Sequence, residues 1–516
     1  MNPAPRSPES TPPAPTGPFR WHRSTVDVVL GPSEPATGTG VPRGFTGIST
    51  DTRTLRDGEL WIALSGPRFD GNEYARRAVE LGAGGLVLRR DPESPNGMPP
   101  VLRDASVSVP VWLVDDPLAS LGRLARARRD ALGVPVVAIT GSTGKTTTKG
   151  YLRAALEAWG PIHATRANEN NRVGVPHTLL ATPTGVHAVV LELGTSEPGE
   201  IRALTRMVDP DLAVLTTVDP THLEGLGSLE GVMEEKLDLI RGLRPGVPVV
   251  VGADPAELAG RVRALRPDSP VTVAGMAGMA GSAEPAGTGD ATGDPHREGM
   301  VHWEGTVTEM DDRGRPTLQV RGPDTESGTE PVHVELPLVG RAASVNAVLA
   351  LAAARTLGLE PVQTAHRLAG VPVEGMRGRV RTVGGITLVE DCYNANPRST
   401  RAALDLLAEL PAPGRRIAVL GSMLELGEAS GEHHARVLEH ARSLRPAPDL
   451  LVLVGEFVGA ARGSEPGPEG PRELHAGSAA GAAALLAGEL EAGDVLLLKG
   501  SRGVRLEEVS RWLEEA

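Results

Sequence analysis

The chain has 516 residues and a net charge of −13 at neutral pH, with 52 basic and 65 acidic side chains. A chain of this length exceeds what one hydrophobic core supports, so we expect about two to four domains. The acidic balance argues against a nucleic-acid partner, because a phosphate-binding surface needs a basic excess.

The beginning of the chain predicts a tail followed by a small domain. Residues 1–40 contain many prolines and no basic-then-apolar signal pattern, which predicts a disordered tail. Across residues 41–130, short apolar segments such as 59–64 and 85–88 alternate with turns. This alternation predicts a small α/β domain.

The middle of the chain, residues 131–339, predicts a doubly wound parallel sheet. Continuous apolar runs lie at residues 134–139, 188–191, 212–215 and 249–251. Such runs are typical of strands buried on both faces, and the helical stretches between them complete the pattern. Residues 275–299 are mainly glycine, alanine, methionine and proline, which predicts a flexible surface insertion.

The last part, residues 340–516, predicts a second Rossmann-like α/β domain. A helix is expected at 345–357, and strands are expected at 386–389, 417–420, 450–454 and 495–498. The only cysteine, Cys392, cannot form an internal disulfide, which suits a reducing cytoplasm. No apolar run approaches the roughly 20 residues that a membrane span needs.

A scarcity of lysine directs attention to the candidate site. The chain has four lysines, Lys145, Lys149, Lys236 and Lys499, and the other 48 of its 52 basic residues are arginines. Lysine can hold a phosphate as a compact point charge or lose its proton, and arginine cannot do the latter. The retained lysines therefore indicate positions where arginine cannot replace them.

A glycine-rich turn between a strand and a helix predicts a phosphate site. Exposed N–H groups and the helix N-terminus point to one place there, where Lys145 contacts the terminal phosphates and Thr146 binds Mg²⁺. The weaker GxxGK[ST] form also occurs in ordinary turns. The residues of this run are Gly141, Ser142, Thr143, Gly144, Lys145, Thr146 and Thr147.

Three further residues predict a divalent-cation site. Glu192 and His222 follow predicted strands, and the carboxyl ends of parallel strands meet at one edge of a sheet. Alone, Glu192 could cap a helix and His222 could be a core histidine. Lys236 could take up CO₂ and become an anionic carbamate that binds Mg²⁺, whereas its spacing alone favours a solvated lysine beside acidic residues.

Together these residues resemble the Mur ligase family, the ATP-dependent amide ligases of peptidoglycan assembly, over nearly the whole chain after residue 44. Within that family they most resemble the branch that adds D-alanyl-D-alanine to UDP-N-acetylmuramoyl-tripeptide. The matching segments are the phosphate loop, 168–171 with 174–176, 192–194 with 198–201, 222–225, Lys236, the YNANP run 393–397, the ELG run 425–427, His434 and the KGSR run 499–502.

The resemblance implies a role for each matching residue. ATP and two Mg²⁺ ions are implied as cofactors, with Thr146 and Glu192 at one ion and His222 and carbamylated Lys236 at the other. Arg377 is implied at the γ-phosphate, Asp391 at the ribose and Asn346 at the adenine, with Asn394 nearby. Substrate contacts are implied for Asp51, Thr52, Arg53, Asp70, Asn168, Asn170, Asn171, Glu425, His434 and Lys499.

The resemblance therefore implies a cytoplasmic, monomeric ligase that works through an acyl phosphate. Two alternatives stay open at this point. Ala342, Ala343 and Ser422 depart from the family pattern, which would suit a related ligase that couples another carboxylate to an amine. A catalytically silent nucleotide-binding module is the other, although it would be expected to have lost Glu192 or Lys236.

Overall fold

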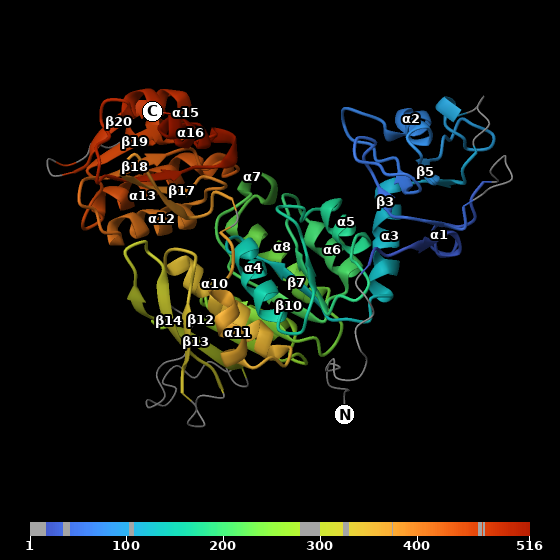
Figure 1. Ribbon diagram of the computed structural model, residues 1–516, viewed down its shortest axis with the longest axis horizontal. Coiled ribbons are helices and arrows are strands. Elements are labelled where there is room, and N and C mark those ends of the chain that lie inside the picture. Colours follow the sequence, from blue (N-terminus) through green and yellow to red (C-terminus); the bar gives the residue numbers. More distant parts are fainter. Residues whose placement is uncertain are drawn as a thin grey trace.

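The computed structural model describes residues 17–34, 42–102, 108–278, 300–323, 330–373, 375–462, 467 and 470–515. Within these ranges the strands form sheets of four, nine and six strands and a small two-stranded sheet. The first and third domains lie on opposite sides of the central domain (Figure 1). The α/β fold with three domains is thereby confirmed.

The first domain is built on a parallel sheet in the order β3-β4-β5-β6. Leu60 and Ile62 pack into one hydrophobic cluster and Trp61 into another, because successive side chains of a strand face opposite sides. The elements are β3 (Ile48–Ser49), β4 (Leu60–Ile62), the 3₁₀ turn η1 (Gly71–Tyr74), α2 (Ala75–Glu80), β5 (Gly85–Arg89), η2 (Pro100–Leu102), β6 (Val111–Val114) and α3 (Pro117–Asp130).

Part of the expected tail is folded, so the prediction of disorder over 1–40 is wrong for residues 17–34. Strand β1 (Trp21–His22) pairs with β2 (Gly44–Phe45), and helix α1 (Arg23–Leu30) follows it. Trp21 is 1% exposed, and its ring meets Phe19 edge-on with centroids 5.2 Å apart. Burial of the Trp21 ring contributes to ordering a segment whose prolines predict disorder. Residues 1–16 and 35–41 lie outside the described residues.

The central domain contains the sheet β15-β14-β13-β12-β11-β10-β7-β9-β8, parallel from β13 to β8 and antiparallel at β14 and β15. Its strands are β7 (Val136–Thr140), β8 (Ile162–Ala164), β9 (Ala188–Glu192), β10 (Leu212–Leu215), β11 (Val249–Gly252), β12 (Val271–Met276), β13 (Val301–Met310), β14 (Pro316–Arg321) and β15 (Val332–Glu335). Its helices are α4 (Lys145–Leu156), α5 (Gly174–Leu180), α6 (Glu200–Val208), α7 (Leu223–Leu226), α8 (Leu229–Arg241) and α9 (Glu257–Leu265). Gly275 and Met276 thus belong to β12, whereas residues 279–299 of the expected insertion lie outside the described residues.

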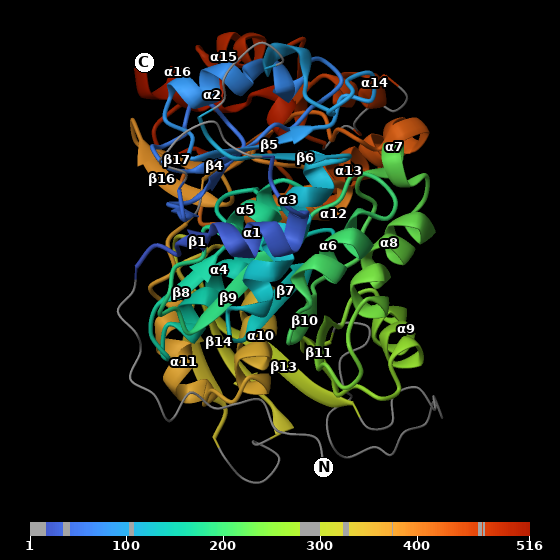
Figure 2. The same cartoon turned by 90° about the vertical axis from the view of Figure 1, so that its right-hand side faces the viewer.

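Helices cover both faces of this sheet (Figure 2). Val136 and Ala138 of β7 pack in the cluster that contains α6 and α8, and Val137 and Ile139 pack in the cluster that contains α4. Helices α10 (Arg341–Thr356) and α11 (Pro361–Leu368) join α4 in the second cluster. The domain boundary expected at residue 340 is therefore too early, since α10 is part of the central core.

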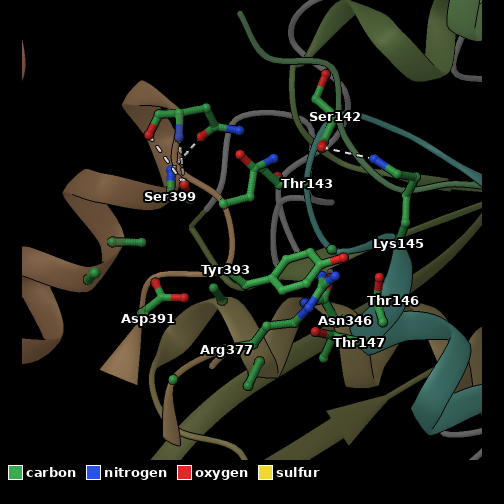
Figure 3. Close-up of a pocket in the computed structure, with 18 of the residues that line it drawn as sticks. Ser142, Thr143, Lys145, Thr146, Thr147, Asn346, Arg377, Asp391, Tyr393 and Ser399 are labelled. Atoms are coloured by element: carbon green, nitrogen blue, oxygen red, sulfur yellow. Dashed lines mark hydrogen bonds between the residues drawn. The ribbon is translucent and has the colours of Figure 1, made fainter. Parts of the chain in front are cut away.

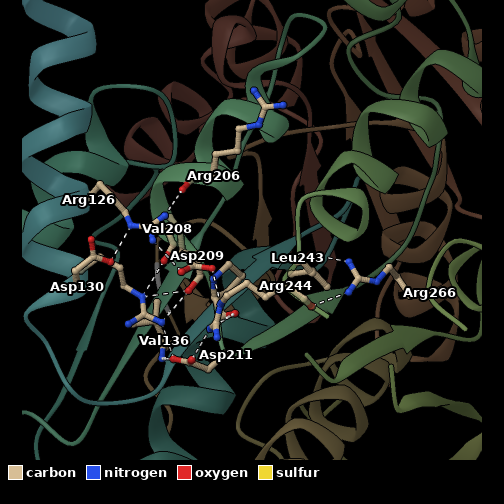
Figure 4. Close-up of polar contacts among 12 residues, drawn as sticks. Arg126, Asp130, Val136, Arg206, Val208, Asp209, Asp211, Leu243, Arg244 and Arg266 are labelled. Atoms are coloured by element: carbon tan, nitrogen blue, oxygen red, sulfur yellow. Dashed lines mark hydrogen bonds and ion pairs between the residues drawn. The ribbon is translucent and has the colours of Figure 1, made fainter. Parts of the chain in front are cut away.

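An arginine–aspartate network ties α3 to the amino ends of the central strands (Figure 4). Arg129 donates to Asp211 Oδ2 at 2.7 Å and to the Asp209 carbonyl at 2.7 Å. Arg126 reaches Asp209 Oδ2 at 3.1 Å, and Arg244 binds the same two aspartates at 2.6 and 2.8 Å. The helix that leads out of the first domain is thus held on the central domain at several points.

The third domain contains the sheet β16-β17-β21-β18-β19-β20, parallel except for β16. The four expected strands are confirmed as β17, β18, β19 and β21. Its elements are β16 (Arg379–Val383), β17 (Ile386–Asp391), α12 (Pro397–Glu409), β18 (Arg416–Leu420), η4 (Gly427–Ala429), α13 (Ser430–Ser443), β19 (Leu450–Val454), α14 (Glu456–Ala461), β20 (Arg472–Ala476), α15 (Ala479–Leu486), β21 (Val495–Lys499), η5 (Arg502–Val504) and α16 (Glu507–Glu515). In the described part of the chain, every helix is too short or too polar to cross a bilayer.

Candidate active site

The glycine-rich turn joins β7 to α4 as the sequence predicts. Gly141 and Gly144 have φ values of 144° and 84°, a region that favours glycine. A Cβ at Gly141 would lie 2.0 Å from Thr216 Oγ1, and one at Gly144 would lie 2.2 Å from Asn346 Oδ1. Both positions therefore require glycine, and the turn presents the N-terminus of α4 as an anion site.

A cavity of about 630 Å³ lies over this turn, between the central and third domains. Figure 3 shows the phosphate loop on one side of the cavity, Asp391 and Ser399 of the third domain on the other, and the Tyr393 ring between them. The predicted site residues that line it are Ser142, Thr143, Gly144, Lys145, Thr146, Thr147, Asn168, Asn170, Asn171, Glu192, His222, Asn346, Arg377, Asp391, Asn394, Glu425 and Lys499.

Glu192 is the most enclosed carboxylate of the cavity, at 2% exposure. Its Oε2 accepts a hydrogen bond from the Thr146 hydroxyl at 2.9 Å, and its Oε1 accepts one from Asn170 Nδ2 at 2.9 Å. Burial alone would raise the pKa of Glu192, but the charges of Lys149 and then Lys145 outweigh burial and hold that pKa below its usual value. A carboxylate whose pKa is lowered, beside a hydroxyl, is a donor set that suits Mg²⁺.

The side chain of Lys145 folds back onto the phosphate loop and contacts its backbone. Its Nζ donates to the carbonyls of Gly141 at 2.7 Å and Ser142 at 3.1 Å. Burial lowers its pKa, although Glu192 and Asp219 favour the charged form. The ammonium is thus placed on the loop that would hold the phosphates.

Lys236 lies on α8 outside the cavity lining, and its side chain is fully buried. Its Nζ has no hydrogen-bond partner among the described residues, so a donor is left unsatisfied. Burial lowers its pKa far below the usual lysine value, and the charge of Lys145 lowers it further. The alternative of a solvated lysine on an acidic helix face, which spacing alone favours, is wrong because this side chain is fully buried.

His222 follows β10 in a left-handed conformation, with a φ of 53°. Its Nδ1 lies 2.5 Å from Oε2 of Glu425 in the third domain. The histidine is therefore at the domain junction, and the reading as a core residue is wrong.

The third-domain residues occupy the ends of two neighbouring strands. Asp391 ends β17 and Lys499 ends β21, and the two residues are partners in the parallel register. Lys499 Nζ lies 3.0 Å from Asp391 Oδ2 and donates to the Asn394 carbonyl at 2.6 Å. The guanidinium of Arg377 stacks on the Tyr393 ring, 4.0 Å from its centroid.

Seven predicted residues are not in the cavity lining as the described residues define it. Gly141 lies in the loop beneath the cavity, and Lys236 lies deeper in the central domain. His434 is buried, and its Nε2 accepts from the Met423 N–H at 2.9 Å, so it supports the backbone before Glu425. The remaining four, in the first domain, are Asp51, Thr52, Arg53 and Asp70.

Asp51 and Asp70 of the first domain make separate polar contacts within that domain. Asp51 binds the Arg53 guanidinium, with one oxygen 2.6 Å from Nη2. Asp70 accepts from the Asn72 N–H at 3.0 Å at the start of η1 and pairs with Arg89 at 3.0 Å. The neighbouring Thr50 hydroxyl lies 2.8 Å from His177 Nε2 on α5, so this loop is attached to the central domain.

Two charged residues that contact the phosphate loop or Glu192 were missed as site residues. Asp219 is 6% exposed and accepts a hydrogen bond from the Thr143 hydroxyl at 3.0 Å. Lys149 lies 3.4 Å from Glu192 Oε2. The scarcity of lysine marks Lys149 in the sequence, whereas Asp219 carries no comparable mark.

The donor set also fits a magnesium nucleotide. Among the described residues, no three His, Cys, Asp or Glu side chains gather as a metal site. Thr146, Glu192 and His222 nevertheless converge on the phosphate loop, where phosphate oxygens would supply further ligands. The buried amine of Lys236 fits conversion to a carbamate, because burial lowers its pKa and so favours the unprotonated nitrogen that reacts with CO₂.

Known proteins resemble the chain in both sequence and structure. Residues 139–354 match the Mur ligase middle domain, and residues 377–502 match the Mur ligase, glutamate ligase domain. The UDP-N-acetylmuramoyl-tripeptide--D-alanyl-D-alanine ligase of Bacillus subtilis is 32% identical over 91% of this chain and 93% of its own. The enzyme of that name from Escherichia coli is also 32% identical, over 91% of this chain and 93% of its own.

Solved structures agree with these matches. A crystal structure of MurF from Acinetobacter baumannii has a TM-score of 0.79 at 26% identity, covering 98% of this chain and all of that one. The MurF ligase of Thermotoga maritima in complex with ADP has a TM-score of 0.72 at 26% identity. The match covers 91% of this chain and 97% of that one. The chain belongs to the Mur ligase family.

Proposed function

We propose that this protein is an ATP-dependent ligase that joins D-alanyl-D-alanine to UDP-N-acetylmuramoyl-tripeptide through an acyl phosphate. One observation carries the proposal: a single cavity brings the phosphate loop and Glu192 together with Arg377, Asp391 and Lys499 of the third domain. The names of the Bacillus subtilis and Escherichia coli relatives support the choice of substrates.

The reaction needs an activated carboxylate, because a free carboxylate is a poor acylating agent. The terminal carboxylate of the tripeptide attacks the γ-phosphorus of ATP, which gives an acyl phosphate and ADP. The amine of D-alanyl-D-alanine then displaces phosphate through a tetrahedral intermediate. The protein contributes mainly by positioning the reactants and stabilising charge.

We assign ATP to the cavity over the phosphate loop. Lys145 and Arg377 neutralise charge on the transferring phosphoryl group. Asp391 binds the ribose, with Lys499 at 3.0 Å holding its carboxylate in place. Asn346 and Asn394 complete the nucleotide contacts, and the hydroxyl of Thr148 donates to Asn346 Oδ1 at 3.3 Å and fixes that amide.

Two Mg²⁺ ions are part of the proposal. Thr146 and Glu192 would hold one ion, and His222 with carbamylated Lys236 would hold the other. Carbamylation joins the neutral amine to the carbon of CO₂ and releases one proton, so it needs the unprotonated Lys236 that burial favours. The ions, when bound, neutralise phosphate charge during transfer.

The two other substrates approach from opposite domains. We assign Asp51, Thr52, Arg53 and Asp70 to the UDP-sugar, and Asn168, Asn170 and Asn171 to the peptide end that reaches the phosphates. Glu425 and Lys499 face the incoming amine, and His434 fixes the backbone before Glu425. We assign the ligase as a monomer, and the use of ATP with a nucleotide-linked substrate supports a cytoplasmic location.

A phosphate-release assay tests the proposal. Purified protein with ATP and Mg²⁺ is expected to release phosphate only when UDP-N-acetylmuramoyl-tripeptide and D-alanyl-D-alanine are both present. Release with a different carboxylate and amine, and none with this pair, would instead identify a ligase of another pathway. Absence of release with every pair tried, despite ATP binding, would support the silent-module reading.

A further inference from the structure

Lys149 is the one lysine without a role in the reaction described above. It lies on α4 one turn after Lys145, so the two side chains project from the same face of the helix. Lys149 is 2% exposed and does not line the cavity. Its ammonium therefore lies beneath the cavity lining and would not contact a nucleotide bound in the cavity.

Lys149 Nζ contacts two groups at once. It lies 3.4 Å from Glu192 Oε2, with both side chains 3% exposed. It also donates to the carbonyl of Ala167 at 3.2 Å. A single ammonium thus links the buried carboxylate to the loop that follows β8.

The loop at Ala167 is held in a costly conformation. Ala167 has a φ of 43°, a left-handed backbone conformation that residues other than glycine rarely adopt. Surrounding contacts must therefore fix it. Three residues later, Asn170 donates to Glu192 Oε1, so the same loop positions the other oxygen of the carboxylate.

A buried carboxylate needs a partner charge when no cation is bound to it. Lys145 is the closest alternative in sequence, but its Nζ is bonded to the Gly141 and Ser142 carbonyls. Lys149 is the cation in direct contact with Glu192. The compact ammonium reaches Oε2 and the Ala167 carbonyl together, whereas a planar guanidinium has a fixed fork of donors.

We propose that Lys149 is a positioning residue for the Mg²⁺ site: it holds Glu192 and the 167–171 loop in the arrangement that receives the magnesium nucleotide. This inference rests on the proposed function, because it takes Glu192 as a magnesium ligand. Groups that orient a metal ligand in this way typically contribute 10–100-fold to metal affinity.

The test measures how ADP binding depends on Mg²⁺. At a fixed ADP concentration, the unfolding temperature is recorded as Mg²⁺ is added, and the Mg²⁺ concentration that gives half of the full rise is the midpoint. Lys149→Met is expected to raise the Mg²⁺ midpoint by about 10–100-fold, while ADP binding in EDTA stays close to that of the unaltered protein. A merely structural role would lower the unfolding temperature equally at every Mg²⁺ concentration and leave the Mg²⁺ midpoint unchanged. The matched control is Arg153→Met, because Arg153 is an exposed residue of the same helix paired with Glu157.

Two further variants keep the proposal falsifiable. Lys149→Arg retains the charge and the fold, and it is expected to raise the midpoint in the same direction. In a Glu192→Gln background, Lys149→Met is expected to add no further shift, because the two residues act as a unit. An unchanged or lower midpoint in Lys149→Met, or in Lys149→Arg should the first variant not fold, overturns the proposal. Failure of the unaltered protein to bind ADP with Mg²⁺ would overturn the proposed function instead.

Discussion

Arg398 of the third domain and Asp219 of the central domain form an ion pair across the domain junction, with Nη1 3.2 Å from Oδ1. Arg398 also pairs with Asp254. The other oxygen of Asp219 accepts hydrogen bonds from the hydroxyls of Thr143 and Thr217, at 3.0 and 2.7 Å. One carboxylate therefore contacts both the phosphate loop and the third domain.

Arg398→Met is expected to loosen the docking of the third domain. The ligase rate should fall about tenfold, which corresponds to a coupling of about 1.4 kcal/mol between domain position and the loop. ADP affinity should change little, because Arg398 is outside the cavity lining. Small-angle scattering and initial rates measure the two effects.

The control for this prediction is Arg401→Met, since Arg401 is an exposed residue of the same helix, α12. It is expected to leave both rate and shape unchanged. Equal losses in the two variants would show that the effect comes from α12 in general and not from the pair with Asp219.

Lys145→Met removes the ammonium that lies on the phosphate loop. The rate of acyl-phosphate formation should fall by about 10²–10³, as for other losses of a group that stabilises transition-state charge. Lys145→Arg should not restore it, because the planar guanidinium cannot occupy the compact position over the Gly141 and Ser142 carbonyls. Rapid-quench kinetics measure the step, and an arginine variant with full activity would contradict the assignment.

Lys236→Met is expected to abolish ligase activity and yet stabilise the ligand-free protein in CO₂-free buffer. The buried amine has no hydrogen-bond partner among the described residues, and an unsatisfied donor costs about 1–3 kcal/mol. Methionine fills the space without that cost. Chemical denaturation measures the free energy of unfolding, and a less stable variant would contradict this reading.

The same variant predicts a pH dependence. Because the pKa of Lys236 is lowered in the folded state, the unfolded chain binds more protons between that pKa and the ordinary lysine value. Lys236 therefore weakens stability progressively as pH falls from about 10. The stability gain from Lys236→Met should grow over that fall and level off below the folded pKa. A gain that is constant with pH would show that the amine is not perturbed.

Trp21→Ala tests whether the folded part of the N-terminal segment supports the first domain. Loss of a buried tryptophan typically costs about 3–5 kcal/mol. The variant should unfold at lower denaturant concentration, with the loss largest in the first domain, which hydrogen exchange can locate. Val28→Ala is the control, because Val28 is 86% exposed on the adjoining helix α1. A neutral Trp21→Ala would show that this segment adds nothing to stability.

Local pattern was enough to predict much of the central and third domains. The run before the phosphate loop is apolar and β-branched, and it forms β7 where such a run should lie, buried on both faces. Glu192 and His222 could be placed together because parallel strands end at one edge. Rare residue types added Lys145 and Lys499, whose contacts in the structure are specific.

Contacts between distant segments could not be predicted in this way. The pair of Arg398 and Asp219 joins residues 179 positions apart, and neither lies in a recognisable spacing. Helix α10 begins where a new domain was expected, yet it packs on α4 because its alanine-rich face fits closely there. Trp21 and Phe19 lie in a segment whose prolines dominate its composition, and the Phe19 ring contacts a distant residue, with the guanidinium carbon of Arg128 on α3 3.9 Å from the ring centroid.

The arginine–aspartate network at the foot of α3 has a mechanical consequence. Because Arg126 and Arg129 of α3 bind Asp209 and Asp211, which Arg244 of the central domain also holds in place, the first domain is fixed on the central domain. The third domain contacts the central domain across the cavity through ion pairs such as Arg398–Asp219, so we expect the third domain to be the part that moves. Under the proposed function, the amine substrate would then move with the third domain toward an acyl substrate held by the first domain.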